Sequence, residues 1–108
     1  MAKSMEHTKL LVLALLSKGD MYGYEMIAQL ERQFDKTFAM KEGTLYPVLK
    51  SLQNEGALTA YTQETPSGRT RKYYHLTEAG VRVLEAETKQ WEVYSKGINA
   101  VVAGAVYG

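Results

Sequence analysis

The side chains best suited to binding chemistry lie in one short stretch, residues 42–56. Hydroxyl, phenol and ammonium groups occur there at Thr44, Tyr46, Lys50 and Ser51. Between them, apolar residues recur with the i, i+3, i+4, i+7 spacing of one helical face, at Leu45, Val48, Leu49 and Leu52. A lone stripe of this kind is more often an ordinary amphipathic helix. The polar set, however, can reach phosphates and base edges, and it predicts a DNA-recognition helix.

The ends of this helix are marked by residues with special backbone properties. Pro47 has no N–H group, but the first turn of a helix leaves its N–H groups unpaired, so a helix that starts at residues 42–44 tolerates Pro47 at the end of that turn. Gly56 suits the C′ position that ends a helix. The residues that we expect to contact base edges are Thr44, Tyr46 and Pro47, the last through a thymine methyl group.

A second group of candidate binding residues is basic. Between Pro66 and Thr77 the chain has no Asp or Glu and holds three cationic residues, Arg69, Arg71 and Lys72. Alone, such a cluster is more often a solvated hairpin end than a binding site. Beside a recognition helix it predicts contacts to DNA phosphates, and the residues that we assign to them are Lys41, Lys50, Arg69, Arg71 and Lys72, with Tyr22 adding its phenol.

The basic residues fall on a predicted β-hairpin. Residues 58–64 and 70–76 are rich in Thr and Tyr, and residues 65–69 between them contain Pro and Gly, which is typical of two strands and their turn. Alternation in the second strand turns Tyr74 inward and leaves a solvent or partner face made of Arg71, Tyr73 and His75. Tyr73 is a candidate both for the core and for a phosphate contact.

Composition limits the function classes. The 108 residues suit one small domain, and the formal net charge of +1 argues neither for nor against a nucleic-acid partner. The absence of cysteine excludes a disulfide framework, a thiolate zinc site and a cysteine nucleophile. The two histidines, His7 and His75, have no neighbours at metal-ligand spacing, and the sequence contains no phosphate-loop or nucleophile motif. We therefore expect no enzyme, metal site or cofactor. Without a bilayer-spanning apolar run or a secretory leader, we expect a cytoplasmic protein with no membrane partner.

Further helices must position the binding residues. The apolar run within residues 6–18 predicts a mostly buried helix that ends at Gly19. We expect Asp20 to cap a second helix at about 21–34, whose buried face holds Tyr24, Ile27, Leu30 and Phe34. Residues 35–40 are expected to form a brief extended connector.

A long final helix is predicted from Glu78 to about residue 102, capped by Thr77. Its length is about twice the globular average, and such a helix on so small a domain needs a partner. The residues of near-heptad spacing that would form a dimer seam are Leu84, Trp91, Tyr94, Ile98 and Val101. The alternative is that this stripe packs on the first helix of its own chain, and we expect both.

Three helices followed by a β-hairpin are the order of a winged helix–turn–helix, an α+β and mainly α fold. We therefore divide the chain into a DNA-binding domain, residues 1–76, and a C-terminal dimerisation helix, residues 77–108. The prediction is a homodimeric regulator that binds double-stranded DNA at an inverted repeat, with half-sites about one helical turn apart. The alternative, for which the near-neutral charge is the motivating observation, is a winged helix used as a protein-interaction module without DNA binding.

Several segments of the chain also match a known family. They are Leu10-Leu11-Val12-Leu13, Gly19-Asp20-Met21-Tyr22-Gly23-Tyr24-Glu25, Glu42-Gly43-Thr44-Leu45-Tyr46-Pro47, residues 49–56 and the run from Gly68 to Gly80 that contains Arg71-Lys72-Tyr73-Tyr74-His75-Leu76-Thr77. Over nearly all of residues 10–84 the chain thus resembles the PadR-type transcriptional regulators. The resemblance implies a dimeric bacterial repressor, joined through its single C-terminal helix and helix 1 of the other subunit.

Part of that family resembles multidrug-responsive regulators that hold flat aromatic compounds between two tryptophans at the dimer centre. Trp91 is at the matching place, which implies a planar aromatic effector. The neighbouring positions of that pocket are Lys9, Leu10, Thr88, Ser95 and Ile98. Thr88 departs from the aromatic residue that a drug-binding relative has at this position.

Overall fold

Three helices enclose one apolar core because each carries an apolar stripe. They are α2 (Thr8–Leu16), α3 (Gly23–Phe34) and α4 (Glu42–Asn54). The structure is a computed structural model that describes residues 7–34 and 40–107. Apolar side chains from all three helices, and one from the first strand of the hairpin, are at most 2% exposed. They are Val12, Leu13, Leu16, Met26, Leu30, Leu45, Leu49, Leu52 and Leu58. Full burial of one such side chain contributes roughly 1.5–3 kcal/mol relative to exposure. This core fixes the orientation of α4.

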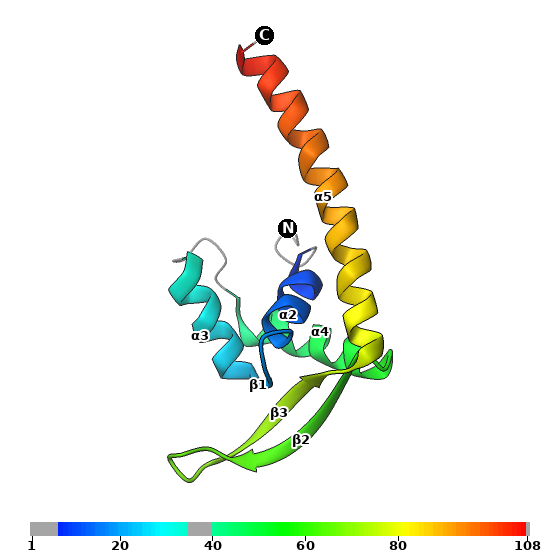
Figure 1. The fold of residues 1–108 in the computed structure, drawn as a ribbon. Coiled ribbons are helices and arrows are strands. Elements are labelled where there is room, and N and C mark those ends of the chain that lie inside the picture. Colours follow the sequence, from blue (N-terminus) through cyan, green and yellow to red (C-terminus); the bar gives the residue numbers. More distant parts are fainter. Residues whose placement is uncertain (1–6, 35–39, 108) are drawn as a thin grey trace.

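A hairpin and a long helix project from the core in opposite directions (Figure 1). The hairpin strands are β2 (Leu58–Glu64) and β3 (Thr70–Leu76), with the predicted bounds, and the long helix is α5 (Glu78–Tyr107). Within the described residues, four helices and a three-stranded antiparallel sheet of order β1-β3-β2 make up the fold. The predicted α+β, mainly α winged helix–turn–helix with a long C-terminal helix is confirmed. We call the β2–β3 hairpin the wing.

Helix α4 has the predicted ends. It begins at Glu42, within the predicted range, so Pro47 is its sixth residue and lies beyond the first turn, in which we expected it. The missing N–H of Pro47 leaves the carbonyl of Gly43 without its usual helical donor. The carbonyl of Lys41 accepts the N–H groups of Thr44 and Leu45, both at 2.9 Å. Gly56 follows the C-cap residue with a φ of 83°, a left-handed conformation that glycine adopts without strain. Leu45 and Leu49 are fully buried, so the opposite side of α4 is presented outward.

The start of α3 differs from the prediction. A short strand, β1 (Met21–Tyr22), precedes the helix and pairs Tyr22 with Tyr73. Asp20 does not cap α3, because its carboxylate binds side chains of the wing. Glu25 instead accepts the backbone N–H of Tyr22 at 3.1 Å, as the glutamate of a capping box does.

One residue expected in the core of α3 lies outside it. Tyr24 is 56% exposed, and Met26 is fully buried in its place beside Ile27 and Leu30. The helix begins at Gly23 rather than at residue 21, which leaves Tyr24 in the first turn, away from the packed face. The connector at residues 35–39 lies outside the described residues, while Met40 belongs to the core.

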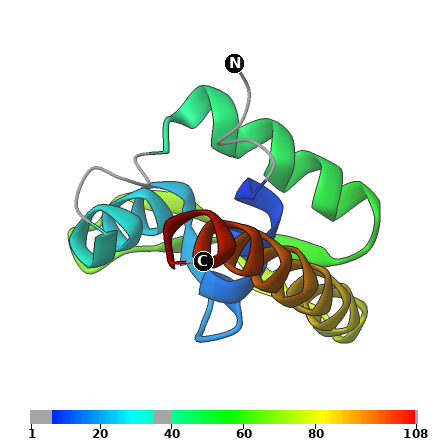
Figure 2. The same ribbon diagram turned by 90° about the horizontal axis from the view of Figure 1, so that it is seen from above.

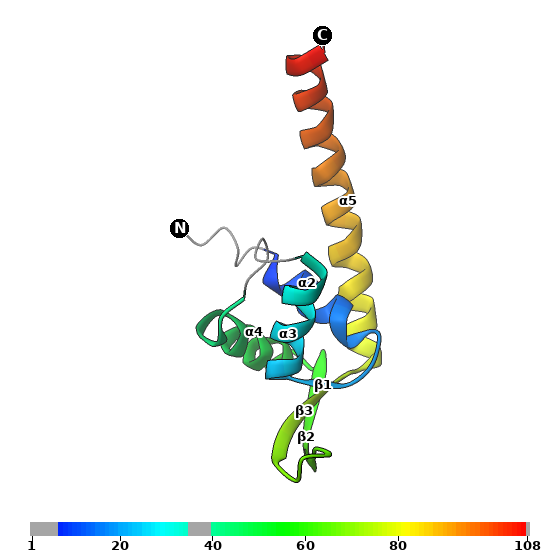
Figure 3. The same ribbon diagram turned by 90° about the vertical axis from the view of Figure 1, so that its left-hand side faces the viewer.

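Helix α5 is anchored at its start and free along its second half. The hydroxyl of Thr77 accepts the N–H of Gly80 at 3.0 Å, which confirms the predicted cap. The first turns pack on α2 and the core, and α2 lies between α4 and α5 (Figures 2 and 3). The helix continues to Tyr107, beyond the predicted end near residue 102, because Ala103 and Ala105 favour helix and a single Gly104 costs only about 1 kcal/mol.

No helix in residues 7–34 and 40–107 meets the length and hydropathy needed to cross a membrane.

Candidate nucleic-acid interface

The outward side of α4 carries most of the predicted base-contacting and phosphate-contacting groups. Pro47, Lys50 and Ser51 are exposed, and so is Lys41 just before the helix. Thr44 is half-buried, and Tyr46 is 42% exposed. Figure 3 shows the wing at the end of the molecule opposite to the C-terminus of α5, with α4 beside α2 and α3. Helix α4 packs against the wing strand β2, so the predicted DNA-contacting groups lie on neighbouring elements.

The wing adds three cations to this surface. Arg69 and Lys72 are exposed and Arg71 is half-buried. The guanidinium carbon of Arg71 lies 5.4 Å from the ring centre of Tyr22, and the ammonium of Lys72 lies 5.7 Å from that of Tyr74. Within the described part of the chain, none of the three pairs with a carboxylate. Their charges are thus available to an anionic partner.

Three tyrosines cross the outer face of the sheet in one row. Tyr22 of β1 and Tyr61 of β2 are both register partners of Tyr73 on the central strand. The ring of Tyr73 meets Tyr22 edge-on at 5.3 Å and stacks on Tyr61 at 5.7 Å. Tyr73 therefore lies outside the core, half-buried between two other rings. Burial by these neighbours is the main cause that raises the pKa of Tyr73.

A polar cluster that the sequence analysis missed lies next to this row. The carboxylate of Asp20 accepts the hydroxyl of Tyr61 at 2.7 Å and lies 2.9 Å from Nδ1 of His75. The bond from Tyr61 is the largest cause that lowers the pKa of Asp20, and its counterpart raises the pKa of Tyr61 to about 12. No local pattern indicated this cluster, since Asp20 is separated from its partners by 41 and 55 positions.

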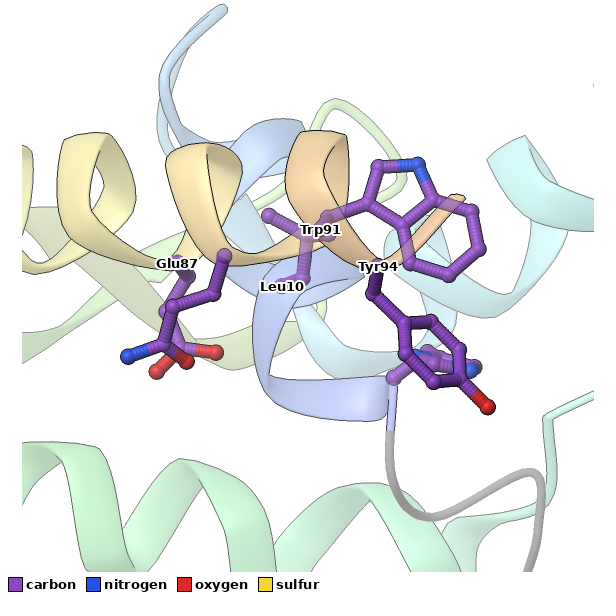
Figure 4. Close-up of a pocket in the computed structure, with 6 residues that line it drawn as sticks. Leu10, Glu87, Trp91 and Tyr94 are labelled. Carbon is purple, nitrogen blue, oxygen red and sulfur yellow. The ribbon is translucent and has the colours of Figure 1, made fainter. Parts of the chain in front are cut away.

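The predicted effector positions are only partly brought together. A cavity of about 550 Å³ lies between α2 and α5, and Figure 4 shows Trp91 and Tyr94 beside Leu10 there. Its lining residues are His7, Leu10, Glu87, Gln90, Trp91 and Tyr94. Only Leu10 and Trp91 belong to the predicted set. The ring of His7, which we had not assigned to any site, meets the Trp91 indole edge-on at 4.9 Å.

The other four predicted effector positions do not line this cavity. The ammonium of Lys9 lies 3.8 Å from a Glu87 oxygen and 3.9 Å from one of Glu55. Thr88 is half-buried, and the hydroxyl of Ser95 donates to the Glu92 carbonyl at 3.2 Å. Ile98 lines a separate groove further along α5.

The predicted dimer residues divide into two groups. Leu84 packs against the core of its own chain. Beyond it, α5 carries an exposed apolar strip that consists of Trp91, Val93, Tyr94, Ile98, Val101 and Val102. Within this strip, a groove of about 470 Å³ is lined by side chains that are almost entirely apolar, together with Gly97. Val93 and Val101 are each 73% exposed, so most of the apolar surface of these two side chains faces solvent.

The fold agrees with the comparisons. The PadR-like transcriptional regulator family matches residues 12–86, and the chain belongs to this family. The negative transcriptional regulator PadR of Bacillus subtilis is 31% identical over 80 residues, which are 74% of this chain and 44% of that relative. The chain thus spans less than half of the length of PadR.

Two solved structures cover nearly the whole chain. The crystal structure of smu.1704 from Streptococcus mutans UA159 has a TM-score of 0.82 and 40% identity, over 99% of this chain and 95% of that one. A PadR family transcription regulator from Clostridium difficile has a TM-score of 0.75 and 32% identity, over 89% and 98% of the two chains.

Proposed function

We propose that this protein is a dimeric DNA-binding repressor that places α4 in the major groove and the wing on the flanking phosphates. The observation that supports this most directly is the contiguity of α4 and the wing: Tyr46 of α4 and Arg71 of β3 line one cavity. The polar side of α4 and the cations of the wing can therefore face one duplex together. In this arrangement Thr44 and Pro47 read base edges, and Lys41, Lys50 and the wing cations bind phosphates.

The dimer is supported by the apolar strip on α5. Apolar patches of this kind mark protein interfaces, and an isolated helix that extends from a small domain gains from a partner. In our proposal a second copy covers Tyr94, Ile98 and Val101, and the twofold symmetry makes the operator an inverted repeat. Repression follows from occlusion of a promoter, as the name of the negative regulator PadR suggests for that relative.

The cavity beside Trp91 supports a planar aromatic effector. Its volume of about 550 Å³ lies in the range of small-molecule sites. The indole is 41% exposed, and an exposed aromatic ring can stack on a planar compound. In the dimer two such indoles would enclose the compound, and binding would release DNA if the compound prefers a dimer with a different wing separation.

The operator can be found directly. Tagged protein is used to capture genomic fragments, which are sequenced, and the recovered fragment is then titrated at several salt concentrations. If about eight phosphates are neutralised per dimer, the plot of log affinity against log salt has a slope near −7. Retention of a protein partner with no retardation of DNA at low salt would instead favour the protein-interaction module.

A charge-matched pair of variants tests the role of the wing. Arg71→Ala removes a proposed phosphate contact, so it should make the slope less steep by about 2 per dimer and weaken all sequences alike. Lys89→Ala removes the same charge from an exposed position on α5, away from the interface, and should leave the slope unchanged. Equal slopes for Arg71→Ala and the wild type would remove Arg71 from the interface.

A further inference from the structure

A small cavity lies where three elements of the proposed DNA-binding surface meet. It measures about 200 Å³, and its lining residues are Tyr22, Gly23, Tyr24, Tyr46, Thr70, Arg71, Lys72 and Tyr74. Two cations and five hydroxyl groups thus surround it, and no carboxylate is among the lining residues. Charged donors and phenols are the groups that bind phosphate oxygens. The chemistry of the cavity therefore fits a phosphate group.

Gly23 lies against the phenol ring of Tyr46 in this cavity. A Cβ atom built on Gly23 would lie 2.5 Å from the hydroxyl oxygen of Tyr46 and 2.9 Å from its Cζ atom. Real Cβ atoms do not approach so closely. Gly23 is not among the glycines of positive φ, so its backbone conformation suits other residues as well. The need for glycine at this position comes from Tyr46, whose ring lies across the start of α3.

The phenol of Tyr46 is suited to donate to an anion. Burial is the largest cause that raises the pKa of Tyr46, and the carboxylate of Glu42 adds to it, while Arg71 acts in the opposite direction. The hydroxyl therefore keeps its proton at neutral pH and donates it to an acceptor. In a site that also contains Arg71 and Lys72, this donor would meet an oxygen whose charge the two cations balance.

We propose that this cavity holds one phosphate of the DNA backbone and that Gly23 is a positioning residue that keeps Tyr46 at its wall. The proposal rests on the DNA-binding function proposed above and makes it more specific. It gives Tyr46 a phosphate contact in place of the base contact that the sequence suggested. Gly23 itself contributes no functional group, and it acts only by leaving room for the Tyr46 ring.

Two glycine variants provide the first test. Gly23→Ala should displace Tyr46 and weaken operator binding by about tenfold, the value of one hydrogen bond to a charged group. Gly104→Ala is the matched control, because a Cβ at Gly104 meets nothing within 4 Å and this glycine lies in α5, away from the proposed DNA-binding surface. It should bind within about twofold of the wild type, since Ala is the better helix former. Thermal unfolding of both variants monitors the fold.

A double-mutant cycle separates positioning from a general effect on structure. Tyr46→Phe, which keeps the ring and removes the donor, should weaken binding equally for all operator sequences. Gly23→Ala should add little further loss when Tyr46 is already replaced by Ala, because the ring that it would displace is gone. If Gly23→Ala binds like Gly104→Ala, or if its loss persists unchanged beside Tyr46→Ala, the positioning role is wrong.

Operator DNA with single methylphosphonate substitutions identifies the anion. One position in each half-site should weaken the wild type by a larger factor than it weakens Tyr46→Phe, since the variant has already lost one of the contacts to that phosphate while Arg71 and Lys72 remain. A loss for Tyr46→Phe that depends on the base pair and on no phosphate would overturn the phosphate assignment and leave the DNA-binding function intact. Absence of any operator binding by the wild type would overturn the proposed function and this inference with it.

Discussion

The hydroxyl group of Tyr61 donates a 2.7 Å hydrogen bond to Oδ2 of Asp20, 41 positions earlier in the chain. The other oxygen of Asp20 lies 2.9 Å from Nδ1 of His75 on the neighbouring strand. One carboxylate therefore joins the turn after α2 to both strands of the wing. The hydrogen bonds stabilise the charged form, so the pKa of Asp20 is lowered from its ordinary value of 3.8.

Replacement of Asp20 by Asn should lower stability in a pH-dependent way. A lowered pKa in the folded state contributes stability above the unfolded value of 3.8, and this contribution is lost as the pH falls through the lower folded value. The side chain of Asp20 is 34% exposed, so solvent screens the interaction and we expect a loss of less than about 1 kcal/mol at pH 7. In urea unfolding, the difference between wild type and variant should shrink as the pH falls from about 4 to about 2.

Glu64→Gln is the control for this prediction. Glu64 is an exposed carboxylate on β2 and forms no ion pair within the part of the chain that the structure describes. Its substitution should change stability little at any pH. A loss of equal size for Asp20→Asn at neutral and acid pH would show that shape or packing, rather than the charge of the carboxylate, causes the effect.

The Asp20 cluster also shows where sequence-based prediction ends. The wing was predictable because its strands alternate and its turn contains Pro66 and Gly68, and α4 was predictable from the spacing of its leucines. These signals are local. The two-residue strand β1 is too short for a periodic pattern, and it forms only because β3 offers a free edge.

No local sequence pattern indicates the contacts between residues that are distant in the chain. The pairing of Gly23 with Tyr46 and the edge contact of His7 with Trp91 depend on how helices cross. The exposure of Tyr24 likewise depends on where α3 begins, which pairing of β1 determines. Residue types were therefore enough to predict the surface of α4 and the wing. The cavities and the Asp20 cluster could be found only in the tertiary structure.

The cap of α5 should make a measurable contribution to stability. Thr77 accepts the N–H of Gly80 at 3.0 Å and donates to the Gly56 carbonyl at 2.7 Å, so it also joins α5 to the end of α4. Thr77→Ala should lower the free energy of unfolding by about 1 kcal/mol, and Thr77→Ser should retain most of it. Urea unfolding measures both. A Ser variant as unstable as the Ala variant would show that the methyl group, and not the hydroxyl, is responsible.

The apolar strip on α5 should control dimerisation. Ile98→Glu places a charge in the groove that also contains Tyr94 and Val101, so the buried carboxylate would lack a partner and the dimer should dissociate. Sedimentation over a concentration series measures the change. Lys96→Glu introduces the same side chain at an exposed position outside the groove and should leave the dimer intact. Dimers of unchanged affinity in both variants would locate the interface elsewhere.

Trp91 should report ligand binding, because it is the only tryptophan of the chain. A planar cationic dye that stacks on the indole should quench its fluorescence in a saturable way, and Tyr94→Ala should weaken the dye because Tyr94 lines the same cavity. Val81→Ala, on an exposed α5 residue outside both this cavity and the apolar strip, serves as the control. Saturation with the dye should lower the affinity for the operator by some factor, and the operator should lower the affinity for the dye by the same factor, since coupling between two sites is reciprocal. Quenching without this reciprocity would make the cavity a binding site that does not regulate DNA binding, and an absence of saturable quenching would exclude such dyes as effectors.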